Sequence, residues 1–382
     1  MNFKNIVVGS GFSGAVVARE IAERKDEKVL IIEKRQHIGG NCYDYYNEQG
    51  ILIHKYGPHI FHTDNREVWN YISQFTEWEH HQHKVLAYID GKKVNLPFNL
   101  NTLYSVFPEV RAKKLEQALL EKYNYNQKVP ILKLRKSNNE LLNLLAEYIY
   151  NKIFKNYTQK QWGVNPEELS PEVSGRVPIV ISRDNRYFTD QYQGLPKKGY
   201  TKLFDNLLDH KNIKIMLNTD FFELFEIDVE NKKILYNDRE FEGYIYYTGQ
   251  IDELFGYRFD ELPYRSLQFK LKKLDINRFQ DVATANYPND YNYTRITEFK
   301  NFYKKHINGT VIAYEYPQPY TKKCEEPPYY PIFNDKNQNQ FKKYLSLANQ
   351  IDNLTILGRL AEYKYFDMDD AVENVLEKIN KP

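Results

Sequence analysis

The sequence predicts an α/β fold in which a domain with a parallel sheet is assembled from discontinuous segments of the 382-residue chain. Three observations predict it. A strand, a glycine turn, a helix and a second strand occupy the first forty residues, a similar pattern returns near the C-terminus, and leucines recur at helical spacing in between. The interruptions predict an inserted helical subdomain and an antiparallel β-sheet domain.

The first forty residues have the pattern of a dinucleotide-binding unit. An apolar strand at 4–8 leads into a G-x-G-x-x-G turn at 9–14, and a second apolar strand at 29–32 is followed by Glu33. A helix that starts at such a turn presents free N–H groups and a partial positive charge to phosphates, and Glu33 is positioned to accept a hydrogen bond from a ribose hydroxyl. We therefore predict a Rossmann-like domain that binds a dinucleotide.

Each glycine of this first turn is expected to have a different structural role. Gly9 allows the tight turn, Gly11 lets the backbone approach a pyrophosphate, and Gly14 lets the helix pack closely on the strand. A second glycine turn, Gly39-Gly40-Asn41, follows soon after. NAD enzymes rarely need it, whereas FAD enzymes of the glutathione-reductase type often have it, because their longer cofactor needs more backbone nearby. An ordinary loop is the alternative, and the combination favours FAD.

The middle of the chain supplies the interruptions. Residues 50–59 form a third apolar segment, and 84–96 predict a hairpin that turns at Asp90-Gly91. From 102 to about 154 the spacing of the leucines predicts helices. Residues 212–247 alternate like strands and end in Thr248-Gly249, and 265–316 predict further antiparallel strands.

The C-terminal segment returns to the first pattern. Residues 354–357 predict a buried strand, Gly358 a turn, and 367–372 the start of a helix with acids in its first turn. Such a helix would direct its positive N-terminus at a flavin ring, which stabilises the anionic reduced flavin. We predict an FAD-binding domain from 1–78, 190–250 and 345–382, a helical subdomain at 100–156, and a substrate domain from 79–99, 157–189 and 251–344.

Composition excludes several classes of protein. The 53 basic and 51 acidic side chains nearly cancel, which argues against a nucleic-acid or membrane partner. Cys42 and Cys324 are the two cysteines, too few for a disulfide framework, and they fit a reducing compartment. Neither a signal segment nor an apolar run of membrane-spanning length is visible. We expect a cytoplasmic protein.

Histidines and arginines are the candidate functional side chains. The histidines form two groups, one of His54, His59 and His62 and one of His80, His81 and His83. Neither has the spacing of a typical zinc site, and we predict no metal. The constrained loop 57–63 is a candidate wall for a flavin ring.

Two arginines are candidates for binding a pyrophosphate. Arg176 lies in 170–178, whose prolines, serine and glycine fit a mobile lid, and Arg359 follows the turn at Gly358. Two arginines facing a pyrophosphate would make charge-assisted, often bidentate hydrogen bonds. A surface arginine is the alternative for either one.

Specific stretches along nearly the whole chain support a family resemblance. They are Gly9 to Ala15, Glu33-Lys34, Gly39 to Asn41, Tyr56 to Thr63, Leu96 to Asn99, Tyr157 to Trp162, Asn185 to Phe188, Tyr264 to Leu267, Tyr293 to Arg295, Glu325 to Pro331 and Gly358 to Tyr363. In these stretches the chain resembles the UDP-galactopyranose mutases, bacterial flavoenzymes that interconvert UDP-galactopyranose and UDP-galactofuranose. The His-Ile-Phe-His loop together with the Lys-Gln-Trp segment is highly specific.

The resemblance implies an isomerase that needs reduced FAD and has no net redox reaction. Flavin N5 would attack the anomeric carbon, expel UDP and hold the sugar as a covalent adduct, which opens and recloses in the other ring form before UDP returns. The nucleophile belongs to the cofactor, so no protein nucleophile is expected. The protein would hold a dianionic leaving group and exclude water. The resemblance also implies a homodimer that supplies galactofuranose for a surface polysaccharide.

The resemblance assigns roles to particular residues. Arg176 and Arg359 would clamp the pyrophosphate, with Tyr187, Tyr329 and Tyr365 donating hydrogen bonds to it. Tyr157 would stack on uracil, Trp162 would pack near the sugar, and His59 and His62 would lie against the flavin. The other implied substrate contacts are Thr158, Arg265, Asn286, Arg295 and His83. The implied cofactor contacts are Gly9, Gly11, Phe12, Ser13, Gly14, Glu33, Lys34, Gly40, Asn41, Tyr56, His59, Ile60, Phe221, Gly358, Arg359, Asp367, Met368 and Ala371.

One residue departs from the family pattern, and two other readings stay open. His83 stands where relatives often have an Asn that reaches the substrate, so this contact and the choice between plain and N-acetylated galactose are open. An amine-oxidase-type flavin oxidoreductase would need an apolar substrate cage, whereas the arginines indicate an anionic ligand. A non-catalytic nucleotide-sugar binding protein would leave the flavin-facing histidines without a purpose.

Overall fold

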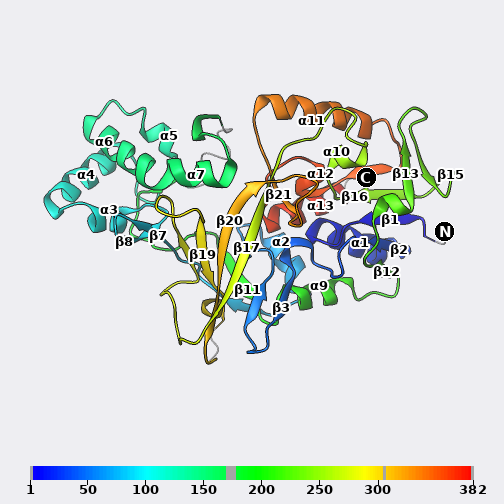
Figure 1. Ribbon diagram of the computed structural model, residues 1–382, viewed down its shortest axis with the longest axis horizontal. Coiled ribbons are helices and arrows are strands. Elements are labelled where there is room, and N and C mark those ends of the chain that lie inside the picture. Colours follow the sequence, from blue (N-terminus) through cyan, green and yellow to red (C-terminus); the bar gives the residue numbers. More distant parts are fainter. Residues whose placement is uncertain (1–2, 169–177, 304–306, 380–382) are drawn as a thin grey trace.

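The computed structural model describes residues 3–168, 178–303 and 307–379 (Figure 1). A five-stranded parallel sheet has the order β12-β2-β1-β16-β22. Its strands come from three separate parts of the chain: β1 (Asn5–Val8) and β2 (Val29–Ile32), then β12 (Ile213–Met216) and β16 (Tyr244–Tyr247), then β22 (Leu354–Ile356). The prediction of a parallel sheet built from discontinuous segments is confirmed.

The alternating side chains of the parallel strands enter two different hydrophobic clusters, as expected for a sheet covered on both faces. Val7, Val29 and Ile31 pack with α1 (Phe12–Arg24), α9 (Tyr200–Leu208) and α13 (Met368–Ile379). Ile6, Leu30 and Ile245 pack with α10 (Ile251–Leu254) and α11 (Asp335–Ala348). The sheet is thereby a rigid base for the turns at the carboxyl ends of its strands.

A seven-stranded mixed sheet lies between the parallel sheet and a group of helices, which Figure 1 draws at the opposite end of the molecule. Its order is β21-β17-β20-β19-β18-β7-β8, and β18 pairs with β7 in parallel whereas the other pairs are antiparallel. The strands are β7 (Val85–Ile89), β8 (Lys92–Leu96), β17 (Tyr264–Leu274), β18 (Thr284–Asn286), β19 (Arg295–Glu298), β20 (Thr310–Pro319) and β21 (Pro328–Pro331). The predicted hairpin is confirmed, with Asp90 and Gly91 both at positive φ.

The helical segment follows this hairpin. It contains α3 (Leu100–Val106), α4 (Glu109–Lys122), α5 (Ile131–Leu134), α6 (Glu140–Ile149) and α7 (Lys155–Trp162), and a π-helical stretch at Tyr150–Phe154 joins the last two. Buried leucines of α4, α5 and α6 share one cluster with the hairpin strands. The predicted helices are confirmed, whereas the exact domain boundaries stay a prediction.

Short elements complete the described chain. They are β3 (Asp44–Tyr46), β4 (Leu52–His54), β5 (Phe61–Thr63), α2 (Arg66–Ser73), β6 (Trp78–His80), β9 (Lys128–Val129), β10 (Ile179–Val180), β11 (Tyr192–Pro196), β13 (Phe225–Asp228), β14 (Lys233–Tyr236), β15 (Arg239–Glu240) and α12 (Gly358–Ala361), with 3-10 turns at Gly40–Cys42, Pro166–Glu168, Phe221–Glu223 and Phe299–Phe302. The apolar segment at 50–59 contributes β4, which pairs with β3 outside the parallel sheet. None of the described helices is both long and apolar enough to cross a membrane.

Candidate active site

A cavity of about 680 Å³ lies at the carboxyl ends of β1, β2 and β16, where open α/β sheets bind ligands. We call it the cofactor cavity. The first glycine turn forms one side: a Cβ on Gly9 would lie 2.3 Å from Thr248 Oγ1, and one on Gly14 only 2.0 Å from the carbonyl oxygen of Gly9. Gly11 differs, because the nearest atom to its added Cβ would be Gly40 Cα at 3.9 Å. Thus Gly9 and Gly14 are required by packing, whereas Gly11 leaves space on the cavity side.

Glu33 is buried at this cavity and holds the glycine turn in place. One carboxylate oxygen accepts hydrogen bonds from Ser10 N at 2.9 Å and Ser10 Oγ at 2.7 Å, and the other accepts one from Arg35 N at 2.9 Å. A carboxylate has about four acceptor positions, so capacity remains for a ribose hydroxyl. That ribose contact stays a prediction.

Arg35 is a cavity residue that sequence reasoning missed. Its guanidinium lies 4.6 Å from the centre of the Tyr56 ring, and Nη2 donates to Asn41 Oδ1 at 2.9 Å. Nη1 is buried without a partner among the described residues. A buried guanidinium nitrogen without an acceptor is costly, and its place on the cavity wall fits an anionic or polar ligand group. The second glycine turn, with Gly39 and Gly40 at positive φ, lies beside it.

The C-terminal elements form the other end of the cofactor cavity. Gly358 has φ of 86°, and a Cβ there would lie 2.7 Å from Ser13 Oγ. Asp367, Met368 and Ala371 line the cavity at the start of α13. All predicted cofactor contacts line this cavity except Ile60, which is buried in the core beside β5.

A second cavity of about 520 Å³, here the substrate cavity, adjoins the first, and Asp367 lines both. Ile153, Phe154, Tyr157, Thr158, Gln161 and Trp162 line it from the π-helical stretch and α7. It is also lined by Asn286, Arg295, Tyr330, Tyr365 and residues of the segment from Asp184 to Asp190. Of the predicted substrate contacts it gathers Tyr157, Thr158, Trp162, Tyr187, Asn286, Arg295 and Tyr365.

Arg295 is one of the charged side chains that line the substrate cavity, together with Lys128, Arg186 and three aspartates. Its guanidinium Nε lies 3.3 Å from Glu315 Oε2, and Nη2 donates to the Tyr157 hydroxyl at 3.0 Å. Burial raises the pKa of Glu315, and Arg295 lowers it only in part. Burial also raises the pKa of Tyr157 to about 12, although Arg295 opposes this, so the phenol stays a neutral donor. The cavity therefore offers a half-buried cation, paired with Glu315, and neutral hydroxyls to a ligand.

Four predicted residues need a different account. Arg265 was expected to line the cleft, but its guanidinium donates to the Gln161 and Lys160 carbonyl oxygens at 2.9 Å, so it lies outside both linings and caps the end of α7. His83 also lies outside both linings, behind the ring of Phe188. Tyr329 lines the cofactor cavity instead, with a buried hydroxyl that has no partner among the described residues. Arg176 falls outside the described residues.

Arg359 lines the cofactor cavity, next to the boundary with the substrate cavity. Its guanidinium lies 5.5 Å and 5.0 Å from the rings of Tyr330 and Tyr365, which face the substrate cavity. It donates to Phe366 O at 2.9 Å and to Tyr329 O at 3.2 Å. The pyrophosphate clamp stays a prediction.

His59 and His62 lie on the two sides of the boundary. His59 lines the cofactor cavity and His62 the substrate cavity. Burial lowers the pKa of His59 to about 3, so it is neutral, and Nδ1 lies 2.8 Å from Gly57 O. His62 is different: burial lowers its pKa, but the carboxylates of Asp190, Asp367 and Asp369 outweigh burial and raise it overall. Among the described residues no group of His, Cys, Asp and Glu side chains is arranged to hold a metal ion.

A family model described as UDP-galactopyranose mutase matches residues 152–365, and a model for an NAD(P)-binding Rossmann-like domain matches 7–75. A protein named "Probable UDP-galactopyranose mutase" from Klebsiella pneumoniae is 37% identical over 382 residues, spanning 99% of this chain and 94% of its own length. The chain belongs to the UDP-galactopyranose mutase family. As a member it is an isomerase, as the sequence predicts.

Two further comparisons bear on this family member. A "dTDP-fucopyranose mutase" from Escherichia coli is 34% identical over 387 residues, covering 98% of this chain and 97% of that protein. A solved structure of a reduced UDP-galactopyranose mutase matches with a TM-score of 0.73 at 16% identity, over 100% of this chain and 93% of that chain. This second likeness supports the fold alone.

Proposed function

We propose that this chain is a flavin-dependent mutase that interconverts UDP-galactopyranose and UDP-galactofuranose, with FAD in the cofactor cavity and the nucleotide sugar in the substrate cavity. One observation carries the proposal: the two cavities adjoin at Asp367, with His59 in one lining and His62 in the other. A cofactor ring that reaches this boundary from the glycine turns would meet a sugar that reaches it from Tyr157. The names of full-length relatives supply the reaction.

The residues of the cofactor cavity fit FAD. Arg35 Nη1 is a buried donor without a protein partner, Gly11 leaves space where a pyrophosphate would lie, and the start of α13 supplies free N–H groups at the far end. When bound, reduced FAD would supply the nucleophile of the ring contraction, through the covalent link from N5 to the sugar that the family resemblance implies.

The chain's own residues would bind, orient and shield the nucleotide sugar. Tyr157 offers a ring and a neutral hydroxyl near Arg295, and the Trp162 ring packs within 6.4 Å of Tyr330, Phe333 and Tyr365. These side chains suit a uracil and a sugar face. Arg359 would bind the pyrophosphate as it leaves and returns, and Arg176, which lies outside the described residues, is the second arginine that the family resemblance implies for this role.

The dTDP-fucopyranose mutase relative supports a second candidate substrate. The two substrate pairs differ in the base methyl group, the ribose 2′-hydroxyl and the sugar 6-hydroxyl, and the cavity lining includes the apolar side chains of Ile153 and Phe154, which suit a methyl group. We prefer the UDP-galactose pair because the family model carries that name. Acceptance of UDP-N-acetylgalactosamine, supply of a surface polysaccharide, a homodimer and a cytoplasmic location also remain parts of the proposal.

One experiment tests the substrate and the cofactor together. The protein is purified with FAD, and UDP-galactofuranose and dTDP-fucofuranose are supplied separately, with and without dithionite, while products are followed by chromatography. The proposal expects conversion of UDP-galactofuranose to the pyranose only after reduction, at least tenfold faster than the dTDP sugar. Faster conversion of the dTDP sugar would show that dTDP-fucose, the second candidate, is the substrate. Equal conversion by the oxidised protein would contradict the role of reduced flavin.

A further inference from the structure

The carboxylate of Asp190 and the ring of Phe188 hold His62 in place, and the proposed reaction gives neither of these two groups a role. His62 lies on β5, which pairs with β11 so that His62 is opposite Gln193. The chain reaches β11 through Phe188 and Asp190. Asp190 Oδ1 lies 3.4 Å from His62 Nδ1, and the Phe188 ring stacks on the imidazole with centroids 3.7 Å apart and planes at 20°. Carboxylate and phenyl ring therefore constrain the imidazole from two directions.

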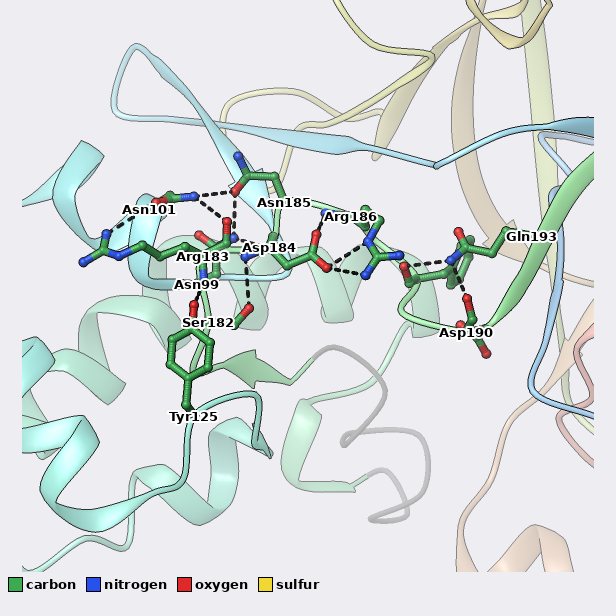
Figure 2. Close-up of polar contacts among 11 residues, drawn as sticks. Asn99, Asn101, Tyr125, Ser182, Arg183, Asp184, Asn185, Arg186, Asp190 and Gln193 are labelled. Atoms are coloured by element: carbon green, nitrogen blue, oxygen red, sulfur yellow. Dashed lines mark hydrogen bonds and ion pairs between the residues drawn. The ribbon is translucent and has the colours of Figure 1, made fainter.

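The segment that carries Asp190 is itself fixed by hydrogen bonds. Gln193, which is buried, donates from Nε2 to Asp190 O at 2.8 Å and to Phe188 O at 3.2 Å (Figure 2). Gln191 N donates to Asp64 Oδ1 at 2.7 Å, which ties the turn to the residue that directly follows β5, the strand of His62. One amide side chain thus sets the backbone from which both contacts with His62 arise.

The preceding residues anchor the same segment to the helical subdomain. Asn99 Nδ2 donates to Asp184 O at 2.7 Å and to Asn185 Oδ1 at 2.9 Å, and Asp184 in turn binds Arg186, as Figure 2 shows. Asp184 and Asp190 are thus two carboxylates of one segment, both on the wall of the substrate cavity. Only Asp190 pairs with a histidine, so the chain contains its own matched control.

The charges around His62 come from several elements. Asp190 precedes β11, Asp367 and Asp369 belong to the start of α13, and all three favour the imidazolium over the opposing effect of burial. The His83 ring also lies beside Phe188, with centroids 5.9 Å apart. Burial holds the pKa of His83 well below its ordinary value, and His81, Arg295 and His62 add to that effect. Beyond Asp190, Lys128 helps to keep that carboxylate ionised. A cation at His62 is therefore favoured, and a second cation at His83 is not.

We propose that Asp190, held by Gln193, is a positioning residue. Its carboxylate forms an ion pair beside Nδ1 of His62, so that a protonated Nε2 is the ring nitrogen left to meet a ligand at the boundary between the cofactor and substrate cavities. The hydrogen bond of Nε2–H would go to an electron-rich atom of whichever group lies there. The role of this arrangement in catalysis rests on the proposed function, whereas the protonation of the His62 imidazole does not depend on it.

The test is a direct titration of His62 in the full-length chain. The nine histidines are labelled at Cε1, and the His62 resonance is assigned by its loss in His62→Gln. We expect the pKa of His62 to lie above 6.5 in the natural protein, and to fall by one unit or more in Asp190→Asn. Asp184→Asn, the matched control, should leave the His62 titration unchanged. Asp190→Glu keeps the charge and should restore most of the shift, even if Asp190→Asn is poorly folded.

Two outcomes would overturn the proposal: a His62 pKa within 0.3 unit of the natural protein in both Asp190 variants, or an equal shift in Asp184→Asn. The titration needs neither flavin nor substrate, so it tests the state of His62 even if the proposed function is wrong. If turnover is present, Asp190→Asn should also move the alkaline limb of the kcat profile to lower pH. If the pKa of His62 falls in Asp190→Asn but the alkaline limb of the kcat profile stays in place, only the catalytic role of the His62 imidazolium is contradicted.

Discussion

Replacing Gly14 by alanine should lower the stability of the fold, whereas replacing Gly11 by alanine should weaken cofactor binding. In Gly14→Ala the new Cβ would lie 2.0 Å from Gly9 O and 3.2 Å from Val7 Cγ1, so backbone must move. In Gly11→Ala the nearest atom would be Gly40 Cα at 3.9 Å, and Gly11 has a φ of −72° that any residue adopts. The first change therefore strains the fold, whereas the second fits the fold and enters the space beside the cavity.

The expected magnitudes follow from these contacts. Overpacking costs about 1–3 kcal/mol, and the upper end applies to Gly14 because its neighbour is backbone that cannot rotate away. Alanine returns about 1 kcal/mol through helix propensity, so the free energy of unfolding should fall by about 2 kcal/mol. Gly11→Ala should stay within about 1 kcal/mol of the natural protein, since only the helix cap changes. It should weaken FAD binding at least tenfold, or about 1.4 kcal/mol.

The assay is urea unfolding of flavin-free protein, together with titration of FAD by fluorescence quenching. Gly50→Ala serves as a control, because no described atom lies within 4 Å of its Cβ and it is remote from both cavities, although its positive φ adds some strain. The reasoning is refuted if Gly14→Ala unfolds at the same urea concentration as the natural protein. It is equally refuted if Gly11→Ala binds FAD with unchanged affinity.

Three other predictions concern charge and hydrogen bonds. Because the pKa of Asp190 is lowered and that of His62 is raised, their pairing stabilises the fold above the unfolded Asp value of about 3.9 and below the unfolded His value of about 6.5. This stabilisation is lost as pH rises through the folded pKa of His62 or falls through that of Asp190. The difference in Tm between natural protein and Asp190→Asn should therefore be greatest between about pH 4 and 6.5. A difference in Tm that is the same from pH 3 to 9 would contradict this. Arg176→Ala and Arg359→Ala should each reduce turnover by two or more orders of magnitude, about 3 kcal/mol, with FAD still bound; natural turnover in either variant would remove that arginine from the clamp. Asn99→Ala removes the N-cap of α3 and two hydrogen bonds to the segment drawn in Figure 2. The free energy of unfolding measured in urea should fall by about 2–3 kcal/mol. An unchanged urea midpoint would contradict this.

Several residues that line the cofactor cavity could be named from local patterns because they lie in short motifs. The glycine turn, Glu33 and the start of α13 each have a signature within about six residues, and parallel strands bring such turns to one edge. Arg35 was missed for the opposite reason. Its partners Asn41 and Tyr56 are not part of its motif, and beside Lys34 it reads as an ordinary surface charge.

The substrate cavity was harder to predict because it depends on tertiary contacts. Arg265 sits at the start of a long strand and was expected to face the ligand, but its guanidinium satisfies the last carbonyl groups of α7, which no local pattern reveals. His83 occupies the place behind Phe188, and its distance from the cavity depends on how that loop packs. The pairing of Asp190 with His62 joins residues 128 positions apart, and a single sequence does not report such a contact.

The most direct test of the central claim is a crystal structure of the reduced protein with FAD and UDP-galactose bound. We predict FAD in the cofactor cavity between the glycine turns and the start of α13, uracil beside Tyr157, and the sugar between His62 and Asp367 with its anomeric carbon within contact distance of flavin N5. A nucleotide sugar outside the substrate cavity, or a flavin ring that does not reach the boundary at Asp367, would contradict the claim.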